Sequence, residues 1–146
     1  MVQVVNDSLA LANELRPALL RLARRVRRES HELGVTAGQA TLLALIGDSP
    51  GITGSELAER EGITAPGISA ALDRLEAASL IERRRGADRR RVGITLSPRG
   101  ARVLRSVRKR RTAWLAERLE RLADDERAAI EAAIGPLRRL VDEDRA

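Results

Sequence analysis

The chain has 146 residues, 43% of them apolar, and its formal net charge of +6 comes from 26 arginines and one lysine against 21 acidic residues. This length and composition suit one globular domain with a core of its own. The chain has no cysteine and one histidine, which excludes disulfides, zinc–thiolate sites and thiol switches, and we expect no metal or cofactor. Because no apolar run reaches membrane-spanning length and no signal-peptide pattern opens the chain, we expect a cytoplasmic protein.

Residues 7–30 are predicted to form the first helix, which Asp7 or Ser8 can cap. An apolar stripe runs along it at spacings of three and four residues and consists of Leu11, Leu15, Leu19, Leu22 and Val26. Pro17 interrupts this pattern. Because proline lacks a backbone donor, it should bend the helix or restart it near Arg16.

A second helix is predicted from Thr36, which can cap it, through Ile46. Its residues are apolar on nearly all sides, so it should lie in the core. Gly34 ends the segment before it, and residues 47–51 form a loop that is dense in turn residues. Ile52 alone could supply a short strand after this loop.

Residues 53–75 have the pattern of a helix-turn-helix. A Thr-x-x-Glu capping box at Thr53 predicts the start of a short helix, and Gly62 breaks it. Thr64 can cap a second helix with Pro66 in its first turn. The apolar face of this second helix is predicted to consist of Ile68, Ala71, Leu72 and Leu75. Its other face carries small or polar residues that could approach a ligand closely, namely Ala65, Ser69, Asp73 and Arg74.

A two-stranded hairpin with an arginine-rich tip is predicted next. Leu80 and Ile81 start one strand, and residues 92–96 alternate at strand period. Residues 82–91 contain six arginines and two acids, which is +4 of the chain's +6. Such a density of like charge repels itself, and DNA is the polyanion that would relieve the repulsion. The alternative interpretation is a solvated arginine cluster in an arginine-rich protein.

Four segments together resemble the MarR family of bacterial transcriptional regulators: residues 63–76 (ITAPGISAALDRLE), 80–83 (LIER), 88–90 (DRR) and 94–100 (ITLSPRG). In that family they correspond to the recognition helix, the first wing strand, the wing tip, and the second strand leading into a long dimerisation helix. The order and spacing of the segments carry the resemblance, which covers nearly the whole chain because the flanking helices also fit.

The Asp-x-Arg wing signature of the family falls on Asp88 and Arg90, and the resemblance implies that Arg90 enters the DNA minor groove while Asp88 braces the wing. We expect DNA contacts from Thr53, Ser55, Thr64, Ala65, Pro66, Gly67, Ser69, Arg74, Arg84, Arg85, Arg89, Arg90 and Arg91. Among these, Arg89 and Arg91 are expected nearer the phosphates.

The outward residues of the recognition helix between Ala65 and Ala70 include none that can make a bidentate base contact. We therefore expect contacts to thymine methyl groups from Ala65 or Pro66 and a hydrogen bond from Ser69. Shape readout by wing arginines in a narrow minor groove should supply much of the specificity.

Two further helices are predicted after the wing, one from Ser97 to about Leu122 and one from Asp124, with a kink near Ala132 caused by Pro136. Amphipathic terminal helices need a surface on which to bury their stripes, and a partner subunit supplies one. The predicted homodimer interface consists of Leu11, Leu15, Trp114, Leu115, Ile130, Ile134, Leu137 and Val141.

The resemblance also implies a small anionic or aromatic effector, bound in a cleft between the dimer-forming and DNA-binding helices. Three basic side chains are candidates to meet such an anion in this cleft: Arg16, His31 and Arg105.

The predicted fold is mainly α with a small β-hairpin wing. Residues 1–146 form one domain, with 36–99 as the winged helix-turn-helix and 1–33 and 100–146 as dimerisation helices. The predicted function is a sequence-specific double-stranded DNA-binding transcriptional regulator, a homodimeric repressor released by a small-molecule ligand. A nonspecific nucleoid-type DNA binder and a winged-helix protein-interaction module are the alternatives. An enzyme is not expected, because the chain has no phosphate-cradling loop, no His-Glu-x-x-His and no second histidine.

Overall fold

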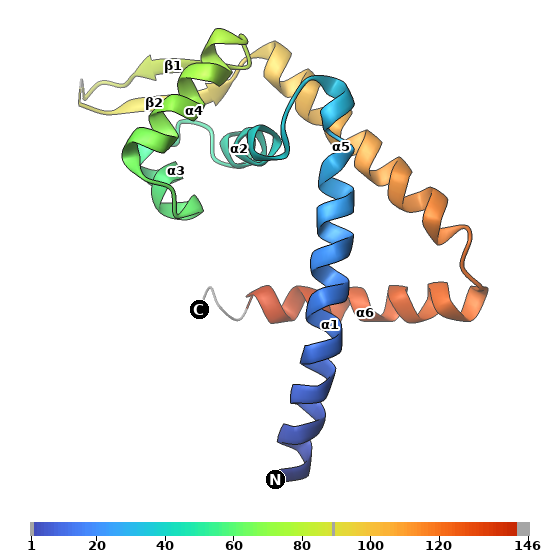
Figure 1. The fold of residues 1–146 in the computed structure, drawn as a ribbon. Coiled ribbons are helices and arrows are strands. Elements are labelled where there is room, and N and C mark those ends of the chain that lie inside the picture. The colour runs from blue at the N-terminus through green and yellow to red at the C-terminus, as the bar shows by residue number, and fades with distance from the viewer. Residues whose placement is uncertain (1, 89, 143–146) are drawn as a thin grey trace. The chain divides into compact units, whose positions relative to one another are not determined.

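The structure, a computed structural model, describes residues 2–88 and 90–142, and the side chains of 7–88 and 90–142 (Figure 1). The chain forms two compact units, Met1–Arg111 and Thr112–Ala146, whose boundary lies inside helix α5. The helices and strands are α1 (Val2–Arg28), the 3-10 helix η1 (His31–Leu33), α2 (Ala37–Asp48), α3 (Gly54–Glu61), α4 (Ala65–Ala77), β1 (Ile81–Arg85), β2 (Val92–Leu96), α5 (Pro98–Leu119) and α6 (Asp124–Asp142). The fold is mainly helical with one antiparallel hairpin, as the sequence predicts.

The predicted helix caps at Thr36, Thr53 and Thr64 are confirmed. Thr36 and Thr53 each accept a hydrogen bond from the backbone N–H three residues on, and each is part of a complete capping box. Thr64 caps α4 in the same way, with Pro66 in the first turn. Gly62 ends α3 at φ 61°, a left-handed conformation that glycine adopts without a steric penalty.

The core of the first unit lies beneath the helix-turn-helix and the hairpin. Helix α2 is its centre, since Leu43 and Ile46 are fully buried. Helices α3 and α4 and the hairpin pack around α2 through buried aliphatic side chains, and α5 closes the core with its first turns. The contributing residues are Leu57, Ile68, Leu72, Leu75, Leu80, Ile81, Ile94, Leu104 and Val107. The core thus fixes how α4 and the hairpin meet.

The hairpin, which we call the wing (residues 81–96), pairs β1 with β2 in antiparallel register, with Ile81 opposite Leu96. Ile52 adds one isolated bridge to Ile94, which is the very short strand predicted before α3. In Figure 1 the wing projects beside α3 and α4. Its register is set by the buried Ile94.

A tight junction joins the wing to α5. The Ser97 hydroxyl donates to the Ser79 carbonyl at 2.6 Å and accepts from the Gly100 N–H at 2.9 Å. A Cβ at Gly100 would lie 1.9 Å from the Leu80 carbonyl oxygen. Only glycine therefore fits this turn of α5 without movement of the backbone.

The predicted start of α1 is wrong, since the helix begins at Val2 and not near Asp7 or Ser8. Of the two effects predicted for Pro17, a bend or a restart near Arg16, the restart does not occur, because the helix continues through Pro17. Pro17 removes one backbone hydrogen bond, while the leucines, alanines and arginines around it are good helix formers. The predicted end of α5 is also slightly late, since the helix stops at Leu119.

The apolar stripe of α1 lies on the surface of its unit, where Leu11 is 64% exposed. In the second unit, α6 runs from Asp124 through Pro136 as one helix, and Ile130, Ile134 and Val141 are exposed along it. Within the described part of the chain, no helix is long and apolar enough to span a bilayer.

Candidate nucleic-acid interface

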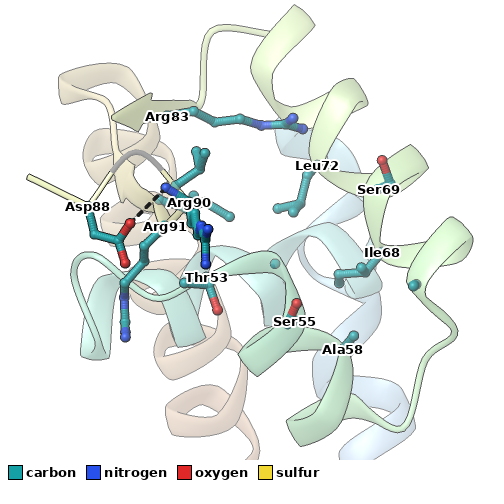
Figure 2. Close-up of a pocket in the computed structure, with 14 residues that line it drawn as sticks. Thr53, Ser55, Ala58, Ile68, Ser69, Leu72, Arg83, Asp88, Arg90 and Arg91 are labelled. Atoms are coloured by element: carbon teal, nitrogen blue, oxygen red, sulfur yellow. Dashed lines mark hydrogen bonds between the residues drawn. The ribbon is translucent and has the colours of Figure 1, made fainter. Parts of the chain in front are cut away.

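A groove of about 610 Å³ lies between α4 and the wing, with α3 as its floor. Figure 2 shows Ile68, Ser69 and Leu72 of α4 on one side of this groove, Arg90 and Arg91 of the wing on the other, and between them Thr53, the N-cap of α3, with Ser55 and Ala58 of α3. Three of the predicted DNA-binding segments therefore meet at one site.

Helix α4 presents its small side chains to this groove. Ala65 and Ser69 line it and are exposed, while Leu72 behind them belongs to the core. Pro66 and Gly67 are exposed in the first turn but do not line the groove. The first turns of α4 are thus open to a close approach by another molecule.

On the floor of the groove, Thr53 and Ser55 differ in whether their hydroxyl groups are available to a ligand. The Thr53 hydroxyl accepts a hydrogen bond from the Glu56 N–H as part of its capping box, whereas Ser55 is exposed. The Thr64 hydroxyl is likewise engaged, since it accepts from the Gly67 N–H at 3.3 Å. Thr53 and Thr64 therefore shape the site through the backbone, and Ser55 offers an outward hydroxyl.

Asp88 acts on the backbone of the wing tip. Its Oδ1 accepts a hydrogen bond from the Arg90 N–H at 3.1 Å, and its carbonyl accepts from the Arg91 N–H at 3.0 Å. This is an aspartate turn, in which a side chain replaces part of a backbone turn. Figure 2 draws the first of these bonds. Arg90, held by the turn, lines the groove and is exposed.

Arg91 joins the wing to α3. Its Nη2 donates to Glu56 Oε1 at 2.9 Å. The Thr53 backbone N–H donates to the same carboxylate, and this bond, followed by the attraction of Arg91, holds the pKa of Glu56 below its ordinary value. Arg91 therefore carries a structural link as well as a positive charge.

Arg84 and Arg85 of the wing face outward. The Arg84 side chain is 80% exposed and, among the described residues, its ion pair is with Glu82 at 3.5 Å, and Arg85 is exposed on the same strand. Both line a smaller hollow on the wing, beside Gly51 and Gly93. Arg89, which we predicted to contact phosphate, lies outside the described residues.

Arg83 is the residue of this site that the sequence interpretation missed. Its Nη2 donates a hydrogen bond to Asp73 Oδ1 at 2.8 Å, and its Nε forms an ion pair with Glu76 Oε2 at 3.1 Å. The guanidinium thus bridges one turn of α4 from β1. The sequence holds a signal for this contact, because two acids three residues apart on a helix share a face.

Arg74, expected at the DNA, lines a different hollow of about 490 Å³ with Arg27 of α1. This second hollow also has apolar walls, formed by Leu42, Ile63 and Ala71. Ile63 is notable there because it is a large aliphatic side chain that remains 39% exposed.

The residues predicted for an effector cleft line neither the groove nor the hollow beside Arg27. Arg16 is exposed on α1, His31 belongs to η1, and Arg105 is exposed on α5. Among the described residues, no group of three or more His, Asp or Glu side chains is arranged to hold a metal ion.

The residues predicted for a dimer interface divide between the two units. In the first unit Leu11 is exposed and Leu15 is half-buried. In the second unit the half-buried residues are Trp114, Leu115 and Leu137, and the exposed ones are Ile130, Ile134 and Val141. The Arg118 guanidinium lies 3.8 Å from the centre of the Trp114 ring, a cation–π contact.

Together, a helix-turn-helix, an arginine-bearing hairpin and a groove between them define a winged helix-turn-helix protein. The model of the MarR family matches residues 33–91. A solved structure from Pseudomonas aeruginosa PA01, described as a candidate transcriptional regulator, is 35% identical, with a TM-score of 0.83 over 94% of this chain and 96% of that chain. A MarR family protein from Bacillus stearothermophilus is 26% identical, with a TM-score of 0.79 over 97% of each chain.

An uncharacterised HTH-type transcriptional regulator of Mycobacterium leprae is 28% identical over 96% of this chain and 99% of its own length. The chain belongs to the MarR family of transcriptional regulators.

Proposed function

We propose that this regulator binds double-stranded DNA sequence-specifically, as a homodimeric repressor that a small-molecule ligand releases. The observation that carries the proposal is the groove in which the small outward side chains of α4, Ala65 and Ser69, face the wing arginine Arg90. A helix with small outward residues can approach base edges closely in the major groove. A wing arginine beside it can reach the adjacent minor groove.

The distribution of charge supports a polyanionic partner. Arg83 and Arg91 are paired with acids of α4 and α3, and Arg84 pairs weakly with its neighbour. Within the described part of the wing, Arg85 and Arg90 make no ion pair, and both are exposed. Uncompensated arginines of this kind gain most from phosphates, whose condensed counterions they displace.

The exposed apolar stripes of α1 and α6 support a homodimer. Large aliphatic side chains on α1, such as Leu9 and Leu20, are more than half exposed, and Leu140 and Val141 of α6 are each 63% exposed. Aliphatic stripes of this size usually mark a protein interface. A dimer would present two copies of α4 to two half-sites of one duplex.

The hollow shared by Arg27 and Arg74 supports a small anionic effector. It combines two guanidinium groups with apolar walls, the combination that a hydrophobic carboxylate requires, and Glu61 is the one acidic residue among the described residues that line it. Arg16, His31 and Arg105 do not line this hollow, so we assign the effector to Arg27 and Arg74 instead.

Selection from a random-sequence duplex pool tests the DNA function. We expect an inverted repeat with half-sites about one helical turn apart.

Arg90→Ala should weaken DNA binding and relax the preference for A·T-rich flanks. Arg84→Ala is the matched control. It should weaken all sequences about equally and reduce the salt slope by roughly one.

Two outcomes would support the alternatives. Recovery of unrelated sequences with a steep salt dependence would indicate a nucleoid-type binder. No binding of duplex DNA at low salt would indicate a protein-interaction module.

A separate experiment tests the effector. A benzoate-like carboxylate should lower the DNA affinity of the wild type and leave the DNA affinity of Arg74→Gln unchanged. The control variant Arg105→Gln should respond to the carboxylate as the wild type does.

A further inference from the structure

The contact between Arg83 and α4 joins the two parts of the molecule that would read DNA. We propose that Arg83 is a positioning residue, which couples the recognition helix to the wing through Asp73 and Glu76 so that both enter one DNA site in register. This inference rests on the proposed DNA-binding function.

The wing end of the contact is held firmly. Arg83 lies in β1 directly opposite Ile94, which is 2% exposed and also bridges to Ile52. The Ile94 carbonyl accepts from the Gly51 N–H at 2.9 Å, and the Ile94 N–H donates to the Ile52 carbonyl at 2.9 Å. The backbone from which Arg83 extends therefore has little freedom to move.

The helix end of the contact lies on the stripe that would face DNA. Asp73 follows Ser69 by four residues, so the two side chains share a face of α4. Glu76 lies one turn further on, and Arg83 itself lines the groove with Ser69. Figure 2 shows the Arg83 side chain extending from β1 toward α4.

The two ion pairs involve different nitrogen atoms of one guanidinium: Nη2, which also donates a hydrogen bond to Asp73, and Nε, which lies 3.1 Å from Glu76 Oε2. A planar group that meets two carboxylates on successive turns restricts both rotation and tilt of the helix, which a single point contact would not do. Because Asp73 and Glu76 are 66% and 51% exposed, these pairs should add little to stability. Their effect should therefore appear in orientation.

The negative charges of Asp73 and Glu76 make the inference testable, because repulsion and positioning predict different changes in DNA binding when these charges are removed. Asp73 and Glu76 are two negative charges on the side of α4 that would face phosphates. If they only repelled DNA, their removal should tighten binding to every duplex. If they position the helix through Arg83, removal should lower the preference for the selected site over a scrambled duplex, even while nonspecific affinity rises.

The first experiment needs no DNA. The chain has no cysteine, so Ala70→Cys in α4 and Ala87→Cys at the wing tip allow two spin labels and a pulsed-EPR distance distribution. Asp73→Asn/Glu76→Gln should broaden this distribution, and Arg84→Gln should leave it unchanged. An unchanged distribution in the double variant would overturn the positioning role, whether or not the protein binds DNA.

The second experiment is a double-mutant cycle, in which DNA affinity is measured for the selected site and for a scrambled duplex. Arg83→Gln should reduce discrimination about tenfold in the wild-type background and less than about twofold in Asp73→Asn/Glu76→Gln. Equal losses in both backgrounds, with a salt slope lower by about one, would identify Arg83 as a phosphate contact and contradict the proposal.

Controls keep these outcomes separate. Arg84→Gln should cost the same affinity in both backgrounds, because Arg84 is exposed and does not touch α4. Arg83→Lys, which can reach only one acid at a time, should lie between the wild type and Arg83→Gln. The melting temperatures of all variants should stay within a few degrees of the wild type. If the wild type selects no DNA sequence, only the proposed function is refuted, because the spin-label distances test the contact between Arg83 and α4 without DNA.

Discussion

Asp88 illustrates how one side chain can have opposite effects through charge and through geometry. Its carboxylate lies among arginines on a surface proposed to meet phosphates, where its charge alone opposes binding. Its Oδ1 also accepts the Arg90 N–H and so shapes the wing tip. The family resemblance implies that Asp88 braces the wing, and the hydrogen bond that its carboxylate accepts comes from the backbone N–H of Arg90.

Substitution at Asp88 separates the two effects. Asp88→Ala removes both the charge and the turn bond, so it should weaken DNA binding by several-fold despite the gain in positive charge. Asp88→Asn keeps an acceptor for the Arg90 N–H and removes the charge, so it should bind DNA at least as tightly as the wild type. Fluorescence anisotropy over a range of salt concentrations measures both. Tighter binding by Asp88→Ala at every salt concentration would contradict the role in the turn.

Glu56 gives the site a pH dependence with a definite sign. Its pKa lies below the ordinary value of 4.5, first because the Thr53 N–H bonds the carboxylate and also because Arg91 attracts it. A group whose pKa is lowered on folding stabilises the protein above its unfolded pKa, and this contribution is lost as the pH falls through the folded value.

The wild type should therefore be more stable than Glu56→Gln at pH 7, because glutamine keeps the cap but not the charge. The free energies of unfolding of the two chains should converge below about pH 4.5, as the Glu56 carboxylate becomes protonated. Urea denaturation at pH 7 and at about pH 3 measures the difference between the two chains. A difference that is the same at both pH values would show that the Arg91 pair and the ionised cap do not contribute.

At the scale of elements, the parts predicted well from the sequence are those decided by local chemistry. The caps at Thr36, Thr53 and Thr64 depend on backbone groups three residues away. The recognition helix and the strands follow from periodicity over a few residues, and the buried positions of α4 match the predicted apolar face.

The contacts that the sequence interpretation missed depend on partners distant in the chain. Arg91 and Glu56 are 35 residues apart in sequence, and no local pattern selects that pair over the many other arginines. The same holds for Arg74, which looks outward on a helical wheel but faces the hollow beside Arg27. In a chain with 26 arginines, tertiary structure decides which of them are paired.

The junction between the wing and α5 yields a prediction on packing. Gly100→Ala would place a methyl group 1.9 Å from the Leu80 carbonyl oxygen, so the backbone must shift and stability should fall by about 2–4 kcal/mol. Gly38→Ala in α2 is the matched control. Its new Cβ would meet nothing closer than Thr36 Oγ1 at 3.9 Å, and it should stabilise the protein by up to about 1 kcal/mol. Thermal unfolding of both variants tests the assigned contact, and equal melting temperatures would refute it.

At the scale of the whole molecule, the core and the aliphatic stripes of the proposed dimer interface occupy different parts of the chain. Every residue of the buried core lies between Val35 and Val107, within the first unit. In the described part of the chain, α1 up to Arg28 and α6 bury no side chain fully. Two long helices with exposed aliphatic stripes are poor structures for a monomer, since they contribute apolar surface to water and nothing to the core.

Burial of these stripes in a homodimer leads to the last prediction. An interface of this obligate kind should bury more than about 2,000 Å² and be rich in aliphatic side chains. The wild type should therefore sediment as a dimer at micromolar concentration, at twice the 16.0 kDa of the chain. Ile134→Glu would bury a charge in such an interface, and it should shift the protein to monomer.

DNA binding should change with the oligomeric state. A monomer brings only one α4 to a two-half-site operator, so Ile134→Glu should lose affinity for the inverted repeat by at least about 100-fold while its binding to an isolated half-site stays near the wild-type value. Ala132→Glu is the control, because Ala132 lies on the opposite side of α6 from the stripe, and this variant should remain dimeric. If Ile134→Glu sediments as the wild type does, α6 does not form the interface, and the dimer must be sought on α1 alone.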